Sequence, residues 1–429
     1  MKVLVVGGGG REHALCWKIR QSPLCTDLVC APGNPGIEKV ARLAPVAAED
    51  VEGLVRLAVA EQIDLVVVGP EKPLSLGLAD ALEKAGIACF GPSREAAQME
   101  SSKAFAKGVM ERAGIPTAAF GVFEDPAEAK AFSRSHGGKV AVKADGLAAG
   151  KGVVVTDTVA DAEAAIDEML VGKAFGAAGA RVVIEEKLEG EEASLIALVD
   201  GERFVMLAPA QDHKRVGEGD TGPNTGGMGA YSPTPAVSAA DLRTIAERVL
   251  APAVAQLKAE GKPFRGALYA GLMMTKDGPK VIEFNARLGD PETQPILARL
   301  DSDLLPALAA AARGDLRGVE LRFSEKPALT VVMAAAGYPA SVRTGDRIEG
   351  LDEVHEDEDL VVFHAGTARK DGAVVTSGGR VLGVTARGAT LEEARARAYA
   401  ACEKIHFAGA HYRRDIAYRA FARVATESQ

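Results

Sequence analysis

The sequence predicts a protein of mixed α/β and α+β class that contains several domains. Its 429 residues are enough for about three domains of roughly 150 residues each. Short apolar runs alternate with helical stretches, and the chain contains 47 glycines, many of them between such runs. Hydrophobic residues form 47% of the chain, which is enough for several buried cores.

The first hundred residues predict a parallel sheet. Strands are expected at Lys2–Val6, Leu65–Val68 and Ala88–Phe90, and a helix at Glu12–Ile19 follows the first strand. Uninterrupted apolar strands that end in glycine-rich turns are typical of parallel sheets covered on both faces. Ligands of such sheets bind beyond the carboxyl ends of the strands, so these turns are candidate binding segments.

A smaller α/β unit is expected between residues 139 and 188. Its elements are a strand at Lys139–Lys143, a glycine-rich loop at Gly146–Gly152, a strand at Val153–Thr156, a helix at Val159–Leu170 and a strand at Arg181–Glu186. The loop differs from a P-loop, which would need glycine in place of Asp145 and Ser or Thr in place of Gly152. Because the loop connects two strands, we predict a flap that folds over phosphates, with Lys143 carrying an ammonium group to them.

The rest of the chain predicts a larger unit followed by a C-terminal unit. The expected elements are strands at Ser194–Val199 and Phe204–Ala208, a helix at about Ala239–Ala259, strands at Tyr269–Met274 and Lys280–Asn285, and then, from about Lys326, strands at Leu329–Ala334, Leu360–His364 and Arg380–Thr385 and a helix at Leu391–Lys404. A long polar loop is expected at Gln211–Pro233. Loops of this length are usually functional or disordered. The ending Gly226-Gly227-Met228-Gly229 favours an ordered loop that approaches a ligand.

Composition and motif spacing argue against several classes of protein. The net charge is −9 and the basic residues are scattered, whereas nucleic-acid binding relies on a clustered basic face. No apolar run reaches the ~18 residues of a membrane helix, and the first strand begins too early for a signal peptide. The five cysteines form no CxxC pair, and neither the seven histidines nor any Ser/His/Asp order indicates zinc or hydrolase chemistry. We therefore expect a cytoplasmic protein with mostly buried thiols.

The segment GGGGREHAL, residues 7–15, follows a strand and opens a helix. Its glycines let a ligand approach the backbone, and the helix N-terminus offers free N–H groups that suit a phosphate. The dinucleotide fingerprint GxGxxG fails, because Glu12 or His13 stands at its last position. A phosphorylated small substrate fits this turn better than a nucleotide cofactor, and a tight turn without a ligand stays an alternative. The turns Pro32–Gly36 and Gly69–Glu71 could face the same crevice.

The segment VIEEKLEGEEAS, residues 183–194, predicts a strand that ends in carboxylates. Glu185 can accept a hydrogen bond from the amino group of adenine, and the backbone of Lys187 and Leu188 can supply the donor and the acceptor of a hinge. Glu192 is placed to bind ribose hydroxyls. A solvated surface turn is the alternative interpretation of such an acidic segment.

The segment VIEFNARLGDPETQP, residues 281–295, is the most informative one. Residues i and i+2 of a strand point to the same side, so Glu283 and Asn285 present two oxygen ligands on one face. These ligands suit Mg²⁺, which keeps water molecules and shares its shell with substrate phosphates. The charged residues that follow are Arg287, Asp290 and Glu292. Desolvating so many polar groups without a ligand would be costly, which favours a binding site over a structural strand end.

Together these motifs resemble the ATP-grasp superfamily and, within it, the glycinamide ribonucleotide synthetase family. The resemblance runs along nearly the whole chain, in the motifs GGREHAL, APGNPG, VGPE, SKAF, KADGLAAGKGV, EEASLI, QDHKR, TGPNTGGMGAYSP, YAGLMM, IEFNARLGDPETQP, HAGT and GGRVLGVTA. The most specific are RLGDPE, QDHKR and GPNTGGMGAY. Two departures are visible: Ala286 stands where many relatives have cysteine, and Tyr269–Met274 lacks the acid that other ATP-grasp enzymes often have there. The second departure leaves the number of metal ions open.

The resemblance implies four parts. They are an N-terminal Rossmann-like parallel-sheet domain at residues 1–101, an ATP-grasp core at 102–122 and 189–325, a small flap domain at 123–188 and a mixed α/β C-terminal domain at 326–429. It also implies the activity, an ATP-dependent ligation of glycine to 5-phosphoribosylamine through glycyl phosphate, in purine biosynthesis. Mg²⁺ is the expected metal, with Mn²⁺ as a substitute. The expected partners are these small molecules, with no nucleic acid and no membrane, and the chain is expected to be a monomer or a weak dimer.

The resemblance further assigns roles to individual residues. The ATP-binding residues would be Lys103, Lys143, Glu185, Glu186, Lys187, Leu188, Glu192, Arg215 and Asn224. The metal ligands would be Glu283 and Asn285. The substrate-binding residues would be Gly8, Gly9, Gly10, Arg11, Asn34, Glu71, Asp212, Arg287, Asp290 and Glu292. The catalytic residues would be Lys143, Asp212 and Arg287, the last of them at the glycine carboxylate or at the transferring phosphoryl group.

Three alternatives stay open. The chain could be another ATP-grasp carboxylate–amine ligase or a carboxylase, a nucleotide-sensing protein without catalysis, or a Rossmann-type oxidoreductase. The pair Glu283 and Asn285 argues against the sensor, and the failed dinucleotide fingerprint argues against the oxidoreductase.

Overall fold

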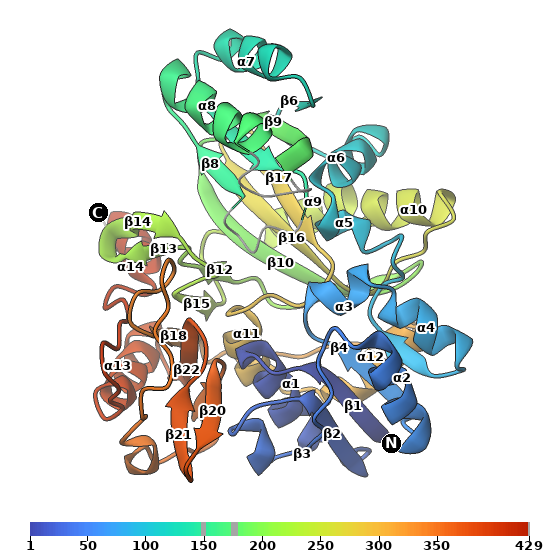
Figure 1. Ribbon diagram of the computed structural model, residues 1–429, viewed down its shortest axis with the longest axis vertical. Coiled ribbons are helices and arrows are strands. Elements are labelled where there is room, and N and C mark those ends of the chain that lie inside the picture. The colour runs from blue at the N-terminus through green and yellow to red at the C-terminus, as the bar shows by residue number, and fades with distance from the viewer. Residues whose placement is uncertain (147–151, 173–178, 428–429) are drawn as a thin grey trace.

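The computed structural model describes residues 1–146, 152–172 and 179–427 of the chain. Four sheets of four or five strands form its framework, which confirms the predicted class. Figure 1 shows a small sheet with two helices above a central sheet, and the N-terminal and C-terminal lobes side by side below it. Residues 147–151 of the predicted glycine-rich loop lie outside the described part of the chain, so the flap expected there stays a prediction.

The N-terminal lobe contains the predicted parallel sheet, in the strand order β3-β2-β1-β4-β5. Its strands are β1 (Lys2–Gly7), β2 (Asp27–Pro32), β3 (Arg42–Leu43), β4 (Leu65–Val68) and β5 (Ala88–Phe90). Its helices are α1 (Gly10–Arg20), α2 (Val51–Ala60), α3 (Glu71–Ser75) and α4 (Leu78–Lys84). In β1, Val3 and Val5 enter one hydrophobic core while Leu4 and Val6 enter the other, which is why this strand is apolar throughout. The predicted strands β1, β4 and β5 are confirmed, whereas β2 and β3 were not predicted.

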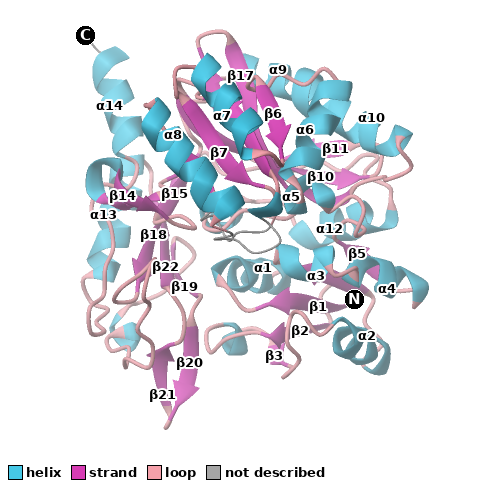
Figure 2. Cartoon of the chain, turned by 45° about the horizontal axis from the view of Figure 1, so that its top comes forward, coloured by secondary structure: helices cyan, strands magenta, loops and turns pink. Residues whose placement is uncertain are grey.

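The small sheet has the strand order β6-β9-β7-β8. Its strands are β6 (Phe120–Phe123), β7 (Val140–Ala144), β8 (Val153–Val155) and β9 (Val182–Glu186). The helices near it are α5 (Gln98–Ser101) and α6 (Lys103–Arg112), which precede the sheet in the chain, and α7 (Pro126–Ser135) and α8 (Val159–Ile166), the last continued by η2 (Asp167–Val171). Helices α7 and α8 lie side by side over one face of the sheet, where Val140, Val142 and Ile184 are buried (Figure 2). The predicted strands of this unit and its helix are confirmed to within a few residues.

The central sheet is antiparallel, in the order β11-β10-β16-β17. Its strands are β10 (Glu191–Asp200), β11 (Phe204–Met206), β16 (Arg265–Thr275) and β17 (Gly278–Asn285). The predicted helix on one face is the continuous run α9 (Ala239–Ile245), η5 (Ala246–Leu250) and α10 (Ala251–Ala259). Helix α12 (Leu304–Arg313), which was not predicted, packs on the other face. Leu195 and Ile196 of β10 therefore belong to two different cores.

The C-terminal lobe contains a five-stranded sheet in the order β12-β15-β18-β22-β19. Its strands are β12 (Gln211–Asp212), β15 (Gly229–Ser232), β18 (Ala328–Ala334), β19 (Leu360–His364) and β22 (Arg380–Arg387). The lobe also contains the hairpin β20 (Thr367–Lys370) and β21 (Ala373–Thr376) and the helices α13 (Leu391–Cys402) and α14 (Tyr418–Glu427). The three strands and the helix predicted for this lobe are confirmed.

The segment Gln211–Pro233 corrects one expectation. It was predicted to be a long loop, but it contains β12, β15 and a hairpin formed by β13 (Arg215–Gly217) and β14 (Thr221–Asn224). Each of these strands has only two to four residues, and β15 pairs with the distant β18. No local sequence pattern therefore predicts these strands. The sheet of the C-terminal lobe thus takes strands from before the expected domain boundary at residue 326.

Helix α11 (Thr293–Arg299) lies where the two lower lobes meet, between α1 on one side and β18 and β22 on the other. It holds the preceding motif segment, 286–292, close to both lobes. All five cysteines are free thiols, and four of them are buried, as expected. Within the described ranges, no helix is both long enough and apolar enough to cross a membrane.

Candidate active site

A cavity of about 780 Å³ lies between the small sheet, the central sheet and the N-terminal lobe. The predicted site residues that line it are Arg11, Glu71, Lys103, Lys143, Glu185, Glu186, Lys187, Leu188, Glu192, Asp212, Arg215, Asn224, Glu283, Asn285, Arg287, Asp290 and Glu292. The predicted residues outside its lining are Gly8, Gly9, Gly10 and Asn34. The structure therefore brings most of the predicted residues to one place.

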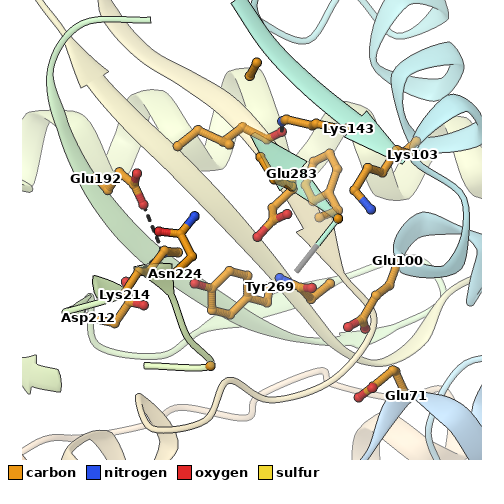
Figure 3. A pocket seen from close by; sticks show the side chains of 18 of the residues that line it. Glu71, Glu100, Lys103, Lys143, Glu192, Asp212, Lys214, Asn224, Tyr269 and Glu283 are labelled. Carbon is orange, nitrogen blue, oxygen red and sulfur yellow. Dashed lines mark hydrogen bonds and ion pairs between the residues drawn. The ribbon is translucent and has the colours of Figure 1, made fainter. Parts of the chain in front are cut away.

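A β-bulge in β17 sets the direction of the two predicted metal ligands. Glu283 pairs with Gly271 of β16, and the pairing then shifts by one residue, which leaves Ile282 as the extra residue of the bulge. Glu283 and Asn285 line the cavity, and Phe284 between them is packed into the core and also borders the cavity. Figure 3 shows the Glu283 carboxylate in the middle of the cavity.

Glu185 binds two lysines at one end of the cavity. Its Oε2 lies 2.7 Å from Lys107 Nζ and its Oε1 lies 2.6 Å from Lys143 Nζ, with all three side chains at most 4% exposed. Lys107 also donates to Thr117 Oγ1 at 2.6 Å, and Lys143 donates to the Ile282 carbonyl at 3.0 Å. Burial lowers the pKa of Lys107 to about 8, although Glu185 acts in the opposite direction. Two ammonium groups against one carboxylate leave a net positive charge, and we call Lys107, Glu185 and Lys143 the cationic cluster.

Lys103 adds a further ammonium group beside this cluster. It is the first residue of α6, whose N-cap Ser102 accepts a hydrogen bond from the Phe105 N–H at 3.1 Å. Its Nζ donates to the Gly146 carbonyl at 3.2 Å. Burial lowers the pKa of Lys103, against the attraction of Glu283. Figure 3 shows Lys103 and Lys143 on the same side of Glu283, where they can together neutralise a polyphosphate.

The end of β9 leads into the predicted adenine contacts. The Lys187 N–H donates to the Lys139 carbonyl at 3.0 Å, and Lys187 Nζ pairs with Asp157 at 2.6 Å. Among the hydrogen bonds between described residues, none uses the Leu188 N–H, so this group is available as a hinge donor. The role predicted for Glu185 at the amino group of adenine stays a prediction, because both of its oxygens bind lysines here.

Lys214 lies at the opposite end of the cavity, between carboxylates. Its Nζ lies 2.8 Å from Asp212 Oδ1 and 3.0 Å from Glu192 Oε2. Figure 3 shows these three side chains together, with Asn224 beside them. Lys214 lowers the pKa of Glu192, against the effect of burial. Burial raises the pKa of Asp212 to about 6; Lys214 opposes this rise, and the nearby Glu292 adds to it.

Glu292 forms the third carboxylate of this end. Its Oε1 accepts hydrogen bonds from Tyr269 Oη at 2.9 Å and from Ser194 Oγ at 3.2 Å. The two hydroxyl groups lie 2.7 Å from each other. Three carboxylates near one ammonium group leave a net negative charge, and we call Glu192, Asp212, Glu292 and Lys214 the anionic cluster.

Arg287 connects the metal-ligand pair to two acids on the N-terminal side. Its Nη2 lies 2.9 Å from Glu100, and its Nε lies 3.6 Å from Glu71. Nη2 also donates to Asn285 Oδ1 at 3.5 Å. Burial raises the pKa of Glu100; in Glu71 the attraction of Arg287 and Arg11 outweighs burial, so that pKa is lowered.

Asp290 is held by Arg380 of the C-terminal lobe. Arg380 Nη1 donates to the carbonyls of Asp290 at 2.7 Å and Gly226 at 2.6 Å, and Nη2 lies 3.5 Å from the Asp290 carboxylate. Gln294 Nε2 donates to Asp290 Oδ1 at 2.9 Å. Burial raises the pKa of Asp290, but Arg380 and Arg11 outweigh this effect and lower it.

The glycine turn after β1 borders the cavity without lining it. The Gly9 N–H donates to Glu12 Oε2 at 2.6 Å, and Arg11 Nε donates to Glu12 Oε1 at 2.5 Å. A Cβ atom added to Gly9 would come within 3.5 Å of the Asp290 carboxylate, so the turn lies against the motif segment 286–292. Arg11 is the residue of this turn that reaches the cavity.

Asn34 joins the N-terminal and C-terminal lobes. Its amide nitrogen donates to the carbonyls of Gly8 and His364, both at 2.9 Å. Its amide oxygen accepts from the N–H groups of Gly36 at 2.9 Å and Ile37 at 3.0 Å. Since both donors and the acceptor are used within the protein, the substrate contact predicted for this side chain stays a prediction.

Glu283 and Asn285 suit a magnesium ion whose coordination shell is shared with a substrate. They offer a carboxylate and an amide oxygen in the cavity that the cationic cluster also lines, where Lys143 Nζ donates to the carbonyl of the adjacent Ile282. In the part of the chain that the structure describes, no group of three or more His, Cys, Asp or Glu residues could hold a metal by itself. Mg²⁺ needs no such cage when phosphate oxygens and water complete its octahedron.

Sequence reasoning missed several polar residues of the cavity. These are Glu100, Lys107, Lys214, Tyr269 and Arg380, and Ser194 behind the lining donates to Glu292. Lys107 had a detectable signal, because it stands four residues after Lys103 on the same helix face. Lys214 follows Asp212 at a spacing of two, within the motif QDHKR. The others become functional candidates only through pairing with distant segments.

Comparison with known families assigns the chain in three successive stretches. Models described as phosphoribosylglycinamide synthetase match residues 1–100 with the N domain, 101–293 with the ATP-grasp (A) domain and 328–419 with the C domain. A phosphoribosylamine–glycine ligase of Caulobacter vibrioides is 56% identical over 422 residues, which is 98% of each chain. One of Brucella melitensis is 53% identical over 423 residues, which is 99% of each chain.

Solved structures give the same result. A phosphoribosylamine–glycine ligase from Thermotoga maritima superposes with a TM-score of 0.85 and 35% identity, covering 97% of this chain and 100% of that one. The biotin carboxylase domain of Hydrogenobacter thermophilus 2-oxoglutarate carboxylase, in complex with MgADP, ADP and bicarbonate, has a TM-score of 0.72 at 19% identity. It covers 96% of this chain and 91% of its own. At so low an identity, this second likeness shows a shared fold.

Proposed function

The chain belongs to the phosphoribosylglycinamide synthetase family, and from this premise we propose that it joins glycine to 5-phosphoribosylamine in an ATP-dependent reaction. The products are glycinamide ribonucleotide, ADP and phosphate, and the reaction is a step of purine biosynthesis. The observation that carries the proposal is the order of groups across the cavity: Glu283 stands between Lys143 of the cationic cluster and Lys214 of the anionic cluster, and Asn285 lines the same cavity.

The first step activates glycine. An oxygen of the glycine carboxylate attacks the γ-phosphorus of ATP, the bond to the β–γ bridging oxygen breaks, and ADP leaves. Lys103 and Lys143 hold the phosphates during this step, because phosphoryl transfer depends mainly on positioning and charge neutralisation. Leu188 binds the adenine ring through its N–H group, and Glu192 holds the ribose. The product of this step is glycyl phosphate.

The second step forms the amide. The amine of phosphoribosylamine attacks the carbonyl carbon of glycyl phosphate, the carbon–oxygen bond to phosphate breaks, and the nitrogen loses a proton. Asp212 and Glu292 hold the ammonium group of glycine throughout, since they supply the negative charge of the anionic cluster. Arg11 and Glu71 face the phosphoribosylamine from the N-terminal side. Water must be excluded because an acyl phosphate hydrolyses readily.

Glu283 and Asn285 would hold Mg²⁺, with Mn²⁺ as a substitute. The ion supplies positive charge at the phosphates of the nucleotide. The oxygen donors of the chain fit such an ion better than a softer metal, which would prefer thiolate or imidazole ligands. The four domain ranges, a cytoplasmic location and a monomeric or weakly dimeric state also stay predictions.

Arg287 has two candidate roles, at the glycine carboxylate and at the transferring phosphoryl group. Replacing it with alanine, Arg287→Ala, should lower kcat by about 10²–10³-fold, because a preorganised cation at the reacting centre is lost. Steady-state kinetics with glycine and with ATP varied in turn separate the two roles: a rise in the KM for glycine supports the first. Turnover equal to that of the unmodified enzyme would contradict both.

A carboxylase is the main alternative, and it is not favoured. The biotin carboxylase domain shares 19% identity with the chain, whereas the ligase of Caulobacter vibrioides shares 56% along nearly the whole length. The two activities differ in the acid that ATP activates, which is bicarbonate in one and glycine in the other.

The proposal is tested by measuring phosphate release with ATP, glycine and freshly generated phosphoribosylamine, omitting each substrate in turn. We expect release only with all three, and formation of glycinamide ribonucleotide in equal amount. A second series replaces glycine with bicarbonate or formate. Phosphate release that ignores glycine, or that bicarbonate supports instead, would overturn the proposal.

A further inference from the structure

The C-terminal segment of the chain reaches back to the hairpin that carries Arg215 and Asn224. This hairpin consists of β13, η4 (Glu218–Asp220) and β14, and Figure 1 shows it beside α14. Both Arg215 and Asn224 line the cavity, and Asn224 stands beside Glu192 and Lys214 (Figure 3). The position of the hairpin therefore decides where these two side chains stand.

The β13–β14 hairpin is joined to the neighbouring sheet at its base, where the Thr225 N–H donates to the Lys214 carbonyl at 2.7 Å. Its strands pair with each other and, among the sheets of the described residues, form a separate two-stranded sheet. Its internal bonds include one from Arg215 Nη1 to the Gly222 carbonyl at 2.8 Å. An isolated two-stranded hairpin is marginally stable in water, so its position depends on contacts with other segments.

Arg413 supplies the central contact of this kind. Its side chain is fully buried, at 0% exposure. Nη1 donates to Asp220 Oδ1 at 2.8 Å and to the Arg215 carbonyl at 3.1 Å. Nε and Nη2 donate to the two carboxylate oxygens of Asp415 at 2.8 and 2.7 Å. One guanidinium group thus joins the hairpin to the C-terminal segment.

Asp220 receives further bonds from the same segment. Tyr418 Oη donates to its Oδ2 at 2.6 Å, and the Arg419 guanidinium donates to the same oxygen. Asp220 has a φ of 57°, in the left-handed region that non-glycine residues seldom adopt. These bonds hold the residue in that conformation at the tip of the hairpin.

Three backbone contacts complete the connection. The Gly219 N–H donates to Asp415 Oδ2 at 2.8 Å, and the Arg414 N–H donates to Glu218 Oε1 at 3.0 Å. His411 Nε2 and the Val216 carbonyl lie 2.9 Å apart. The segment 411–419 therefore contacts β13 and η4 at several points.

We propose that residues 411–419 form a latch that holds the β13–β14 hairpin at the nucleotide site, with Arg413 as its central positioning residue. The proposal rests on the proposed function, because it takes Arg215 and Asn224 as the ATP-binding residues that the resemblance to the family implies. Arg413 itself does not line the cavity, so it acts through the hairpin. Loss of its side chain would leave the partly buried Asp415 without the arginine it pairs with and Asp220 with Arg419 alone, which is unfavourable.

The latch stays closed over the neutral pH range. Burial acts to raise the pKa of Asp220, but hydrogen bonds from Tyr418 and Arg413 outweigh it and hold this pKa well below the ordinary value. A carboxylate with a lowered pKa contributes stability that is lost only as the pH falls through the folded-state value. The latch is therefore a fixed support rather than a switch.

The test compares Arg413→Met with the matched control Arg414→Met. Arg414 is the neighbouring arginine, but its side chain is exposed and lies over the Tyr412 ring, and its bond to Glu218 of the hairpin comes from the backbone N–H, which the substitution keeps. Binding of a non-hydrolysable ATP analogue is measured by titration calorimetry on the full chain. We expect Arg413→Met to raise the Kd about tenfold, which corresponds to ~1.4 kcal/mol. The control should leave the Kd unchanged.

Steady-state kinetics separate positioning from a purely structural role. For Arg413→Met we expect the KM for ATP to rise by the same factor, with the KM for glycine unchanged. The conservative Arg413→Lys should recover part of the loss, because lysine keeps the charge without the planar fork. If Arg413→Met fails to fold, Asp220→Asn tests the same contact more mildly, with a smaller rise in Kd expected.

Two outcomes overturn the latch. One is an unchanged Kd in folded Arg413→Met or, where that variant does not fold, in Asp220→Asn. The other is an equal effect in the Arg414→Met control. Since analogue binding needs no ligase reaction, a chain that binds nucleotide but does not ligate glycine would refute the proposed function and leave the latch standing.

Discussion

The two ends of the cavity contain the same kinds of charged group in opposite proportions. In the cationic cluster two lysines bind one carboxylate, whereas in the anionic cluster three carboxylates surround or approach one lysine. The first end therefore attracts phosphates and the second attracts an ammonium group. The cationic cluster is almost fully buried, so its net charge is less screened than that of a surface pair, whereas Lys214 and Glu192 of the anionic cluster are 35% and 43% exposed. The polarity of the cavity therefore follows from the number of charged groups of each sign at its two ends, not from the residue types alone.

The largest expected effect comes from removing the lysine that faces the phosphates. Lys143→Met should lower kcat by about 10²–10³-fold, because a preorganised charge at the transferring phosphoryl group is lost. This variant also leaves one oxygen of Glu185 without its cation, but Glu185 keeps its pair with Lys107, so we expect the protein to stay folded at a reduced stability. Phosphate release measures the change. A near-normal kcat would show that the cationic cluster does not act on the reaction.

Removing Lys107, the other lysine that pairs with Glu185, should affect the stability of the protein more than its reaction rate. Lys107→Met leaves one oxygen of Glu185 without its cation, and breaking a buried ion pair costs about 3–5 kcal/mol. We expect ~3 kcal/mol, the lower end of that range, because Lys143 remains. Urea unfolding measures this change. Unaltered stability together with a lost kcat would reverse the roles given to the two lysines.

The anionic cluster predicts a pH effect near neutrality. The pKa of Asp212 is raised to about 6 by burial, so below that pH the carboxyl group is protonated and the cluster loses one negative charge. We expect kcat/KM for glycine to fall below pH about 6. Asp212→Asn should lower kcat/KM about tenfold at pH 8 and abolish this acid limb, since a bond between charged groups contributes ~1.5–3 kcal/mol. If kcat/KM for glycine still falls at low pH in Asp212→Asn, the protonation of another group causes the decrease.

The raised pKa of Asp212 also determines the direction in which its contribution to stability changes with pH. A carboxyl group whose folded-state pKa lies above the unfolded value binds more protons when folded, so its contribution to stability decreases as the pH rises from about 3.8 to about 6. Keeping Asp212 ionised in the anionic cluster therefore lowers the stability of the fold, as is common for residues of functional sites.

Sequence reasoning was most successful where a local pattern decides the structure. The spacing of Glu283 and Asn285 on one strand placed both at the cavity, and the apolar runs located the central strands. It failed where a contact joins distant segments. Glu185 meets Lys143 because Glu185 pairs with Ala141 on the adjacent strand, which brings the lysine two residues further along beside it. No single segment contains that information.

Arg413 illustrates the same limit. In the sequence it stands in the run Tyr412-Arg413-Arg414-Asp415, where nothing distinguishes it from its exposed neighbour Arg414. Only the fold shows that one guanidinium is buried against the β13–β14 hairpin while the other is exposed. The strands of that hairpin were missed for a related reason, since they are too short to show a periodic pattern.

The most direct test of the account is a crystal structure with a non-hydrolysable ATP analogue, Mg²⁺ and glycine. The account predicts the triphosphate against Lys103 and Lys143, the metal on Glu283 and Asn285, and the glycine ammonium group at Asp212 and Glu292. A nucleotide bound elsewhere, or a glycine whose ammonium group lies at the cationic cluster, would contradict it.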